Sequence, residues 1–192
     1  PDDSKTMVVI PTIISSREKI KNMFDTLETF YIMNKTDNLY FTLLGDVTAS
    51  DQEVLELDSE LSQFGIEYAS KLNKKYKKDI FYFLYRKRFW NEKENSYLGY
   101  ERKRGALLQF NQLLLHKMSK KDQDYWYFAN TLGDFSDDIK YVITLDQDNR
   151  LVLNTALNLV GAMAHPMNRP VLNKEGTKVV KGYALMQPRV SL

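Results

Sequence analysis

Two carboxylates, Asp146 and Asp148, stand one residue apart directly after an apolar segment, 141–145. Such a D-x-D pair supplies the hard oxygen ligands that Mg²⁺ and Mn²⁺ prefer, and the bound cation can offset the charge of a diphosphate. If 141–145 is a buried strand of an α/β sheet, the pair follows its carboxyl end, where such sheets bind ligands. The pair is therefore the first candidate for a metal site.

The same tripeptide recurs at Asp122 and Asp124, after the charged stretch 119–121, and we interpret that copy as solvated surface. A strand followed by D-x-D also opens the phosphatase motif of the haloacid-dehalogenase class. That motif continues with Gly and then Thr or Val, whereas Asn149 and Arg150 follow here. The context favours the copy at Asp146 as the functional one.

A third carboxylate, Asp46, follows the apolar segment 39–44 and Gly45. A carboxylate at the end of a strand accepts hydrogen bonds, for example from the edge of a base or from a ribose hydroxyl. The alternative is that Gly-Asp-Val-Thr forms a turn in which Asp46 caps the next segment. The sequence leaves both interpretations open.

Three consecutive cations, Arg102, Lys103 and Arg104, precede an apolar helical pattern. Guanidinium and ammonium groups bind diphosphates, although a solvated face is the ordinary interpretation of a charge run. Positive charge opposes the dipole at a helix N-terminus, so helix stability does not explain these residues. They end a basic region, 71–104, and the acidic region 51–67 contains no basic residue.

The elements that must position these groups alternate along the chain. Apolar β-branched runs predict strands, and apolar residues at i, i+3, i+4 and i+7 predict helices. This order indicates an α/β domain over 1–192 with a mostly parallel sheet and helices on both faces. We predict strands at 6–14, 39–44, 80–85, 141–145 and 182–190, and helices with apolar faces at 20–31 after a Ser15 cap, 54–72, 107–118, and 157–164 after an Asn154 cap.

The composition excludes several classes of protein. The 192 residues include no cysteine and two histidines, which rules out disulfide scaffolds, zinc ribbons, thiol nucleophiles and three-histidine metal sites. The net charge of +2 argues against a nucleic-acid binder, and no glycine-rich phosphate loop occurs. There is no apolar run of the roughly 18 residues that a membrane span needs. Because the chain begins without Met, we expect it to be a processed product or a piece of a larger protein.

Long ordered segments along nearly the whole chain closely resemble the glycosyltransferase domain of cyclic β-1,2-glucan synthases. The segments are Val-Val-Ile-Pro-Thr at 8–12, Leu-Leu-Gly-Asp at 43–46, Trp-Asn at 90–91, Tyr-Glu-Arg-Lys-Arg-Gly at 100–105, Tyr-Val-Ile-Thr-Leu-Asp-Gln-Asp at 141–148, Met-Ala-His-Pro-Met-Asn-Arg-Pro-Val at 163–171, and Gly-Tyr with Gln-Pro-Arg-Val within 182–190.

The resemblance implies a Rossmann-like GT-A fold, the nucleotide-diphospho-sugar transferase fold, truncated at its C-terminus. It also implies an inverting glucosyltransferase that uses UDP-glucose and Mn²⁺ or Mg²⁺ to build β-1,2-glucan. Carried over residue by residue, it assigns the metal to Asp146 and Asp148, the nucleotide sugar to Pro11, Thr12, Asp46, Arg102, Lys103, Arg104 and Asp146, and the donor or acceptor side to Gln187 and Arg189.

Proteins of this family are multi-pass enzymes of the inner membrane, so the resemblance places the chain at the cytoplasmic membrane face, as a soluble donor-binding part. Its partners would be UDP-glucose, a glucan acceptor and the remaining domains, with no nucleic acid. The general base is expected beyond Leu192, so we expect the chain to bind UDP weakly and to turn over poorly. The alternatives are a transferase that makes another linkage and a non-catalytic α/β module that binds a nucleotide or a partner.

Overall fold

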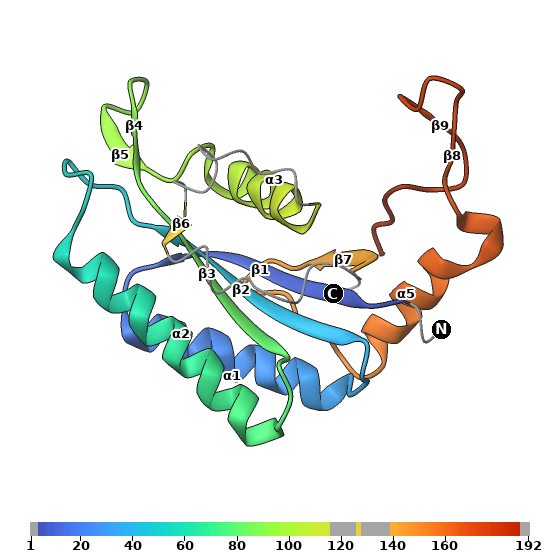
Figure 1. Cartoon of the computed structure of the whole chain (residues 1–192), viewed down its shortest axis with the longest axis horizontal. Coiled ribbons are helices and arrows are strands. Elements are labelled where there is room, and N and C mark those ends of the chain that lie inside the picture. The colour runs from blue at the N-terminus through green and yellow to red at the C-terminus, as the bar shows by residue number, and fades with distance from the viewer. Residues whose placement is uncertain (1–3, 116–125, 128–138, 189–192) are drawn as a thin grey trace.

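A five-stranded sheet forms the centre of the computed structural model, which describes residues 4–115, 126–127 and 139–188 (Figure 1). The strand order is β6-β3-β2-β1-β7, with β1, β2, β3 and β7 parallel and β6 antiparallel to β3. The mostly parallel α/β class predicted from the sequence is thus confirmed. The strands of this sheet are β1 (Thr6–Ile14), β2 (Leu39–Val47), β3 (Phe81–Arg86), β6 (Trp126–Tyr127) and β7 (Tyr141–Thr144).

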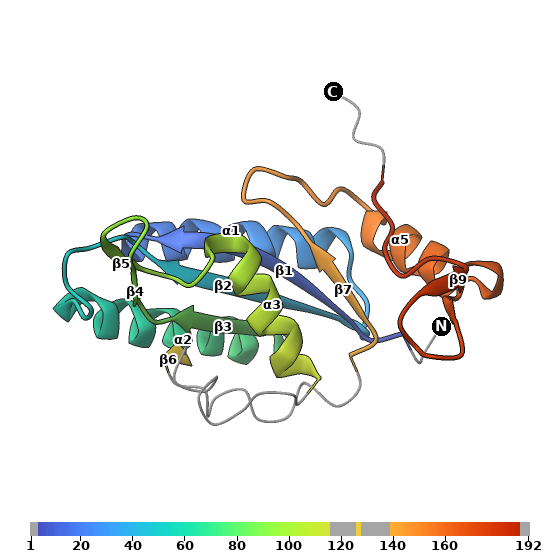
Figure 2. The same cartoon turned by 90° about the horizontal axis from the view of Figure 1, so that it is seen from above.

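Helices cover both faces of the sheet, as predicted (Figures 1 and 2). On one face, α1 (Arg17–Met33) and α2 (Glu56–Tyr76) pack against the strands, and α3 (Arg102–Leu114) crosses the other face. The buried side of α1 is the apolar stripe read from the sequence, from Ile20 to Tyr31. The predicted cap was one residue early, because Ser16 and not Ser15 accepts the backbone N–H of Lys19, at 3.1 Å.

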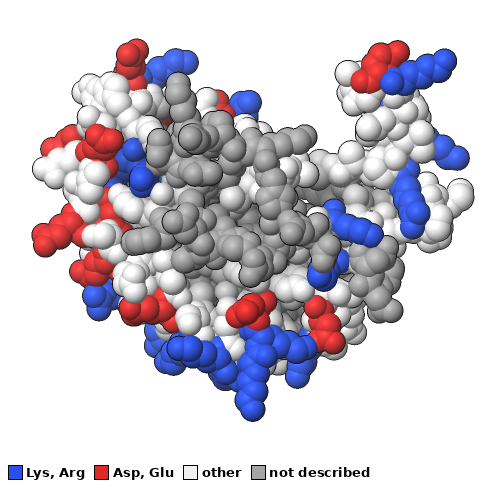
Figure 3. Space-filling view, viewed as in Figure 1, with Lys and Arg blue, Asp and Glu red and all other residues white. Residues whose placement is uncertain are grey.

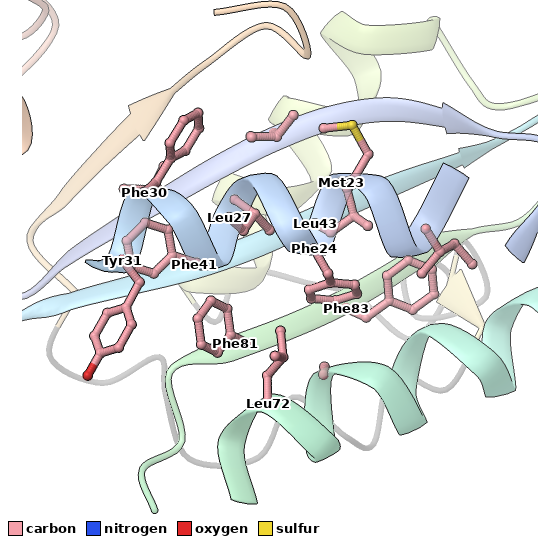
Figure 4. Packing of buried hydrophobic residues seen from close by; sticks show 14 of the residues in the cluster. Met23, Phe24, Leu27, Phe30, Tyr31, Phe41, Leu43, Leu72, Phe81 and Phe83 are labelled. Atoms are coloured by element: carbon pink, nitrogen blue, oxygen red, sulfur yellow. The ribbon is translucent and has the colours of Figure 1, made fainter. Parts of the chain in front are cut away.

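The larger core lies between the sheet and the pair α1 and α2, and aromatic rings fill much of it (Figure 4). Phe24 of α1 faces Phe83 of β3 with ring centroids 6.2 Å apart, and Tyr31 meets Phe41 edge to face. Gly65 of α2 leaves room for the Phe83 ring, since a Cβ there would lie 2.2 Å from it. Such close packing fixes where the strands end, and therefore where the polar side chains at those ends lie.

Four details differ from the sequence prediction. The strand predicted at 39–44 continues to Val47, so Asp46 lies inside β2. The strand β7 is half exposed rather than buried, because β1 is its one neighbour among the described strands. Leu115, expected on the buried face of the helix predicted at 107–118, is the residue after the end of α3 and is 61% exposed. No described residue of 182–190 is in a strand, since the pairing of the chain ends at Lys181.

The remaining elements are short. β4 (Phe89–Asn91) and β5 (Ser96–Leu98) form a hairpin before α3, and α5 (Thr155–Ala164), η2 (Pro166–Asn168), β8 (Val171–Leu172) and β9 (Val179–Lys181) follow β7. Asn154 stands at the start of α5 without a capping hydrogen bond from its side chain. None of the described helices is long and apolar enough to cross a membrane.

The acidic and basic regions of the sequence meet along α2. Its first turn carries Glu56 and Asp58, and its last turn carries Lys74 and Lys75. Figure 3 shows acidic side chains gathered near the start of this helix and basic side chains near its end. This arrangement complements the helix dipole, so part of the charge segregation seen in the sequence stabilises α2.

Candidate functional site

The strand order creates a crevice next to β1. From β1 the chain proceeds through β2 to β3 on one side, and it places β7 on the other side of β1. Parallel α/β sheets bind ligands outside the carboxyl ends of the strands at such a reversal of strand order. A cavity of about 500 Å³ lies there. Its lining includes seven of the residues predicted from the sequence: Pro11, Thr12, Asp46, Arg102, Lys103, Asp146 and Asp148.

The loop that carries the D-x-D pair is tied to β1 and α1. Asn149 closes a turn by donating its N–H to the carbonyl of Asp146, at 3.1 Å. Between the two aspartates, Oε1 of Gln147 accepts the Thr12 hydroxyl at 2.8 Å and the Lys19 ammonium at 2.9 Å. Thr12, expected at the nucleotide, therefore also holds the D-x-D loop. Gln147 and Lys19 were not predicted as residues of the site. The position of Gln147 inside the D-x-D motif could have indicated its role.

A cation from α3 contacts the first aspartate of the pair. Nζ of Lys103 forms an ion pair with Oδ1 of Asp146, and both side chains are about half exposed. Exposed pairs of this kind contribute little, roughly 0–1 kcal/mol. The contact therefore orients two groups in the cavity without fixing them rigidly.

Asp46 lies at the base of the cavity and is almost fully buried. Its Oδ1 accepts the Val47 N–H at 3.0 Å, and its Oδ2 lies 3.3 Å from Nη1 of Arg86. Burial raises the pKa of Asp46, and the Arg86 charge and the Val47 N–H partly oppose this rise. The alternative of a Gly-Asp-Val-Thr turn in which Asp46 caps the next segment is thus wrong, because Asp46 is a strand residue paired with a buried guanidinium.

Arg86 also fixes the start of α3. Its guanidinium donates to the carbonyl of Arg102 at 2.9 Å and to the carbonyl of Tyr100. Glu101 and Arg102 adopt left-handed backbone angles, with φ of 49° and 51°. Such angles cost about 1–3 kcal/mol each for non-glycine residues and persist where the surroundings impose them. Arg86 thereby holds a strained turn that brings Lys103 to the cavity.

Gly99 packs directly against the Asp46 carboxylate, since a Cβ at Gly99 would lie 1.9 Å from Oδ1 of Asp46. We expect Gly99→Ala to lower the free energy of unfolding by about 1–3 kcal/mol, because overpacking displaces a buried ion pair. Urea unfolding measures this loss. Gly161→Ala in α5, where a Cβ meets nothing within 4 Å, is the control and should be neutral or stabilising. Equal effects in the two variants would contradict the prediction.

Among the described residues, two that were predicted at the site, Arg104 and Gln187, do not line the cavity. The Arg104 side chain is 83% exposed and lies 3.5 Å from the Glu101 carboxylate. Gln187 is exposed in the segment after β9 and is not among the residues around the cavity. Arg189 lies outside the described residues, as do Asp122 and Asp124.

The carboxylate oxygens that border the cavity suit a divalent cation that is bound jointly by the protein and a ligand. Asp146 and Asp148 both border the cavity, and the described part of the chain contains no cluster of three or more acidic or histidine side chains suited to a metal. Mg²⁺ is commonly bound by one or two carboxylates, with substrate phosphates and water completing its shell. Two carboxylates facing a cavity that Lys103 and Arg102 also line match that pattern.

The fold and cavity together define a Rossmann-like α/β domain whose binding crevice lies at the reversal of strand order. Over its full length the chain is 36% identical, across 194 aligned residues, to the cyclic β-(1,2)-glucan synthase NdvB of Rhizobium meliloti (strain 1021). The chain spans 7% of the length of that protein, and no family model matches it. The relationship to cyclic β-1,2-glucan synthases predicted from the sequence is thus confirmed, for a segment of such a protein.

Proposed function

We propose that this chain is the donor-binding part of an inverting, metal-dependent glucosyltransferase that uses UDP-glucose to build β-1,2-glucan. The observation that carries the proposal is the cavity itself, which Asp146 and Asp148 line together with Arg102 and Lys103. Carboxylates that can hold a divalent cation, combined with cationic side chains in the same cavity, suit a diphosphate. The similarity of the whole chain to a segment of a cyclic glucan synthase supports glucan as the product.

In the proposed reaction, a hydroxyl of the acceptor glucan attacks the anomeric carbon of glucose and gives its proton to a general base in another part of the enzyme. The bond to the β-phosphate oxygen breaks, and UDP leaves with the electron pair. Asp146 and Asp148 would hold Mn²⁺ or Mg²⁺, which supplies Lewis-acid stabilisation of the leaving diphosphate. Lys103 and Arg102, which line the same cavity, would add positive charge where negative charge develops.

Different sides of the cavity are proposed to bind different parts of the nucleotide-sugar donor. Pro11, Thr12 and Asp46 come from the ends of β1 and β2 and are proposed to border the nucleoside, with Thr12 next to the D-x-D loop through its bond to Gln147. Asp46 is already engaged with Arg86, and the two aspartates of the loop are assigned to the metal. We therefore propose that the general base, the membrane attachment and the acceptor site belong to other parts of the enzyme.

Titration calorimetry with UDP tests the donor site. The 192-residue chain is expected to bind UDP more tightly with Mn²⁺ than without it. Exchanging both carboxylates, Asp146→Asn with Asp148→Asn, should remove that Mn²⁺ dependence and weaken binding at least about ten-fold, because the metal no longer bridges protein and diphosphate.

The second D-x-D copy provides a matched control. Asp122→Asn with Asp124→Asn makes the same chemical change in the same tripeptide and should leave Mn²⁺-dependent UDP binding intact. If UDP does not bind, or if the two double variants behave alike, the donor-site assignment is wrong. A partner-binding α/β module would then be the better interpretation.

A further inference from the structure

The ion pair between Lys103 and Asp146 occupies the carboxylate that the proposed function assigns to a divalent cation. The ammonium group takes up one of the lone pairs of this carboxylate, and its positive charge repels a divalent cation at the same group, so the two cations compete for Asp146. Within the described part of the chain, Asp148 forms no ion pair. The loop therefore presents one carboxylate held by a cation and one open to solvent.

The two sides of this contact differ in their freedom to move. On the carboxylate side, Gln147 is held by Thr12 and Lys19, which restrains the loop. On the cation side, the backbone at the start of α3 is held by Arg86, but the Lys103 side chain is long, flexible and half exposed. Displacing Lys103 from Asp146 therefore requires rotation of one side chain and no shift of the backbone.

We propose that Lys103 is an exchangeable counter-ion: a divalent cation displaces it from Asp146, and the released ammonium group then binds the diphosphate in the same cavity. This inference rests on the proposed function and adds an order of events to it. A divalent charge outcompetes an ammonium at a site with two carboxylates, and the exposed ion pair opposes it only weakly. The freed Lys103 stays beside the cavity, because its backbone is fixed there.

The exchange predicts that Lys103→Met raises the affinity for Mn²⁺ and lowers the affinity for UDP. Without the competing ammonium, Mn²⁺ alone should bind about two- to five-fold more tightly, the range that corresponds to an exposed ion pair. With Mn²⁺ saturating, UDP should bind about ten-fold more weakly, because one charged hydrogen bond to the diphosphate is lost. A residue that merely supports the fold would weaken both affinities.

The experiment measures Mn²⁺ affinity from the electron paramagnetic resonance signal of free Mn²⁺, and UDP affinity by calorimetry. Arg104→Met is the matched control, since it removes one positive charge from the next residue, whose exposed side chain pairs with Glu101. It should leave the Mn²⁺ affinity unchanged. Lys103→Arg keeps the charge and should restore most of the UDP affinity.

Tighter Mn²⁺ binding in Lys103→Met, combined with weaker UDP binding, supports the exchange. Unchanged or weaker Mn²⁺ binding in that variant overturns it, as does an equal gain in Arg104→Met, which would indicate a general electrostatic effect. If the wild-type chain binds both Mn²⁺ and UDP, either of these two outcomes overturns the exchange alone and does not contradict the proposed function. If the wild-type chain binds neither, the proposed function and the exchange both fail.

Discussion

Replacing Arg86 with methionine is expected to lower the free energy of unfolding by about 3–5 kcal/mol, the usual loss when one partner of a buried ion pair is removed. The Arg86 and Asp46 side chains are 1% and 7% exposed, so water cannot replace the guanidinium. The carbonyls of Tyr100 and Arg102 lose their donor in the same variant. The strained turn before α3 should then relax, and UDP binding should weaken as well.

The pH dependence of this loss identifies its cause. Burial raises the pKa of Asp46, and without Arg86 the pKa rises further. When the pKa of a carboxyl is higher in the folded state than its unfolded value of about 3.9, the free energy of unfolding falls as the pH rises from the unfolded pKa through the folded pKa. The penalty of Arg86→Met should therefore be smallest near pH 4 and should grow toward neutral pH.

Urea unfolding of three variants at several pH values makes the comparison. Adding Asp46→Asn to Arg86→Met removes the uncompensated carboxylate and should recover part of the lost stability at neutral pH. Arg104→Met removes an exposed arginine and should change stability by less than about 0.5 kcal/mol. A penalty that does not vary with pH would show that the ion pair is not its source.

Replacing Asn34 with leucine is expected to cost about 2–4 kcal/mol, because it orphans buried backbone groups of the chain that follows the D-x-D loop. Asn34 is fully buried after α1. Its Nδ2 donates to the carbonyls of Leu151 and Val152 at 3.3 and 3.2 Å, and its Oδ1 accepts the Ala156 N–H at 3.1 Å. These bonds anchor the far end of the loop that bears Asp146.

Asn22→Leu is the matched control, since it makes the same exchange at an exposed position of α1 and should have little effect on stability. Hydrogen exchange should show faster exchange at 151–156 in Asn34→Leu, and Mn²⁺ should bind more weakly because its ligands are less well positioned. Full stability with unchanged exchange would contradict the anchoring role of Asn34.

The parts of the fold that the sequence predicted well are those with a strong period. The nine residues of β1 and the apolar stripe of α1 match the structure because burial of one continuous surface dictates both patterns. The face of α3 was harder to predict. Its buried positions include Gly105 and Gln109, which hydrophobic spacing does not mark, whereas the apolar Leu115 is exposed.

The candidate site was predicted at the level of residues but not of contacts. That Asp46 and Asp146 border one cavity follows from the rule that the carboxyl ends of parallel strands share an edge, whereas Lys103 comes to the same cavity from the start of α3. The burial of Arg86 and Arg88 was missed, because both lie in a basic region that reads as solvated surface. Arg88 pairs with the buried Asp58. Only the fold reveals which carboxylate each arginine meets.

The pairing of β7 with β1 also has a consequence for how the protein folds. Partners on β1 and β2 are separated by 33 positions, whereas Thr12 and Gln147 are 135 positions apart. Closing the longer loop costs roughly 1 kcal/mol more chain entropy, so β7 is expected to join the sheet late. The cavity is then the last part to assemble, and a ligand that binds it stabilises only chains that have completed the sheet.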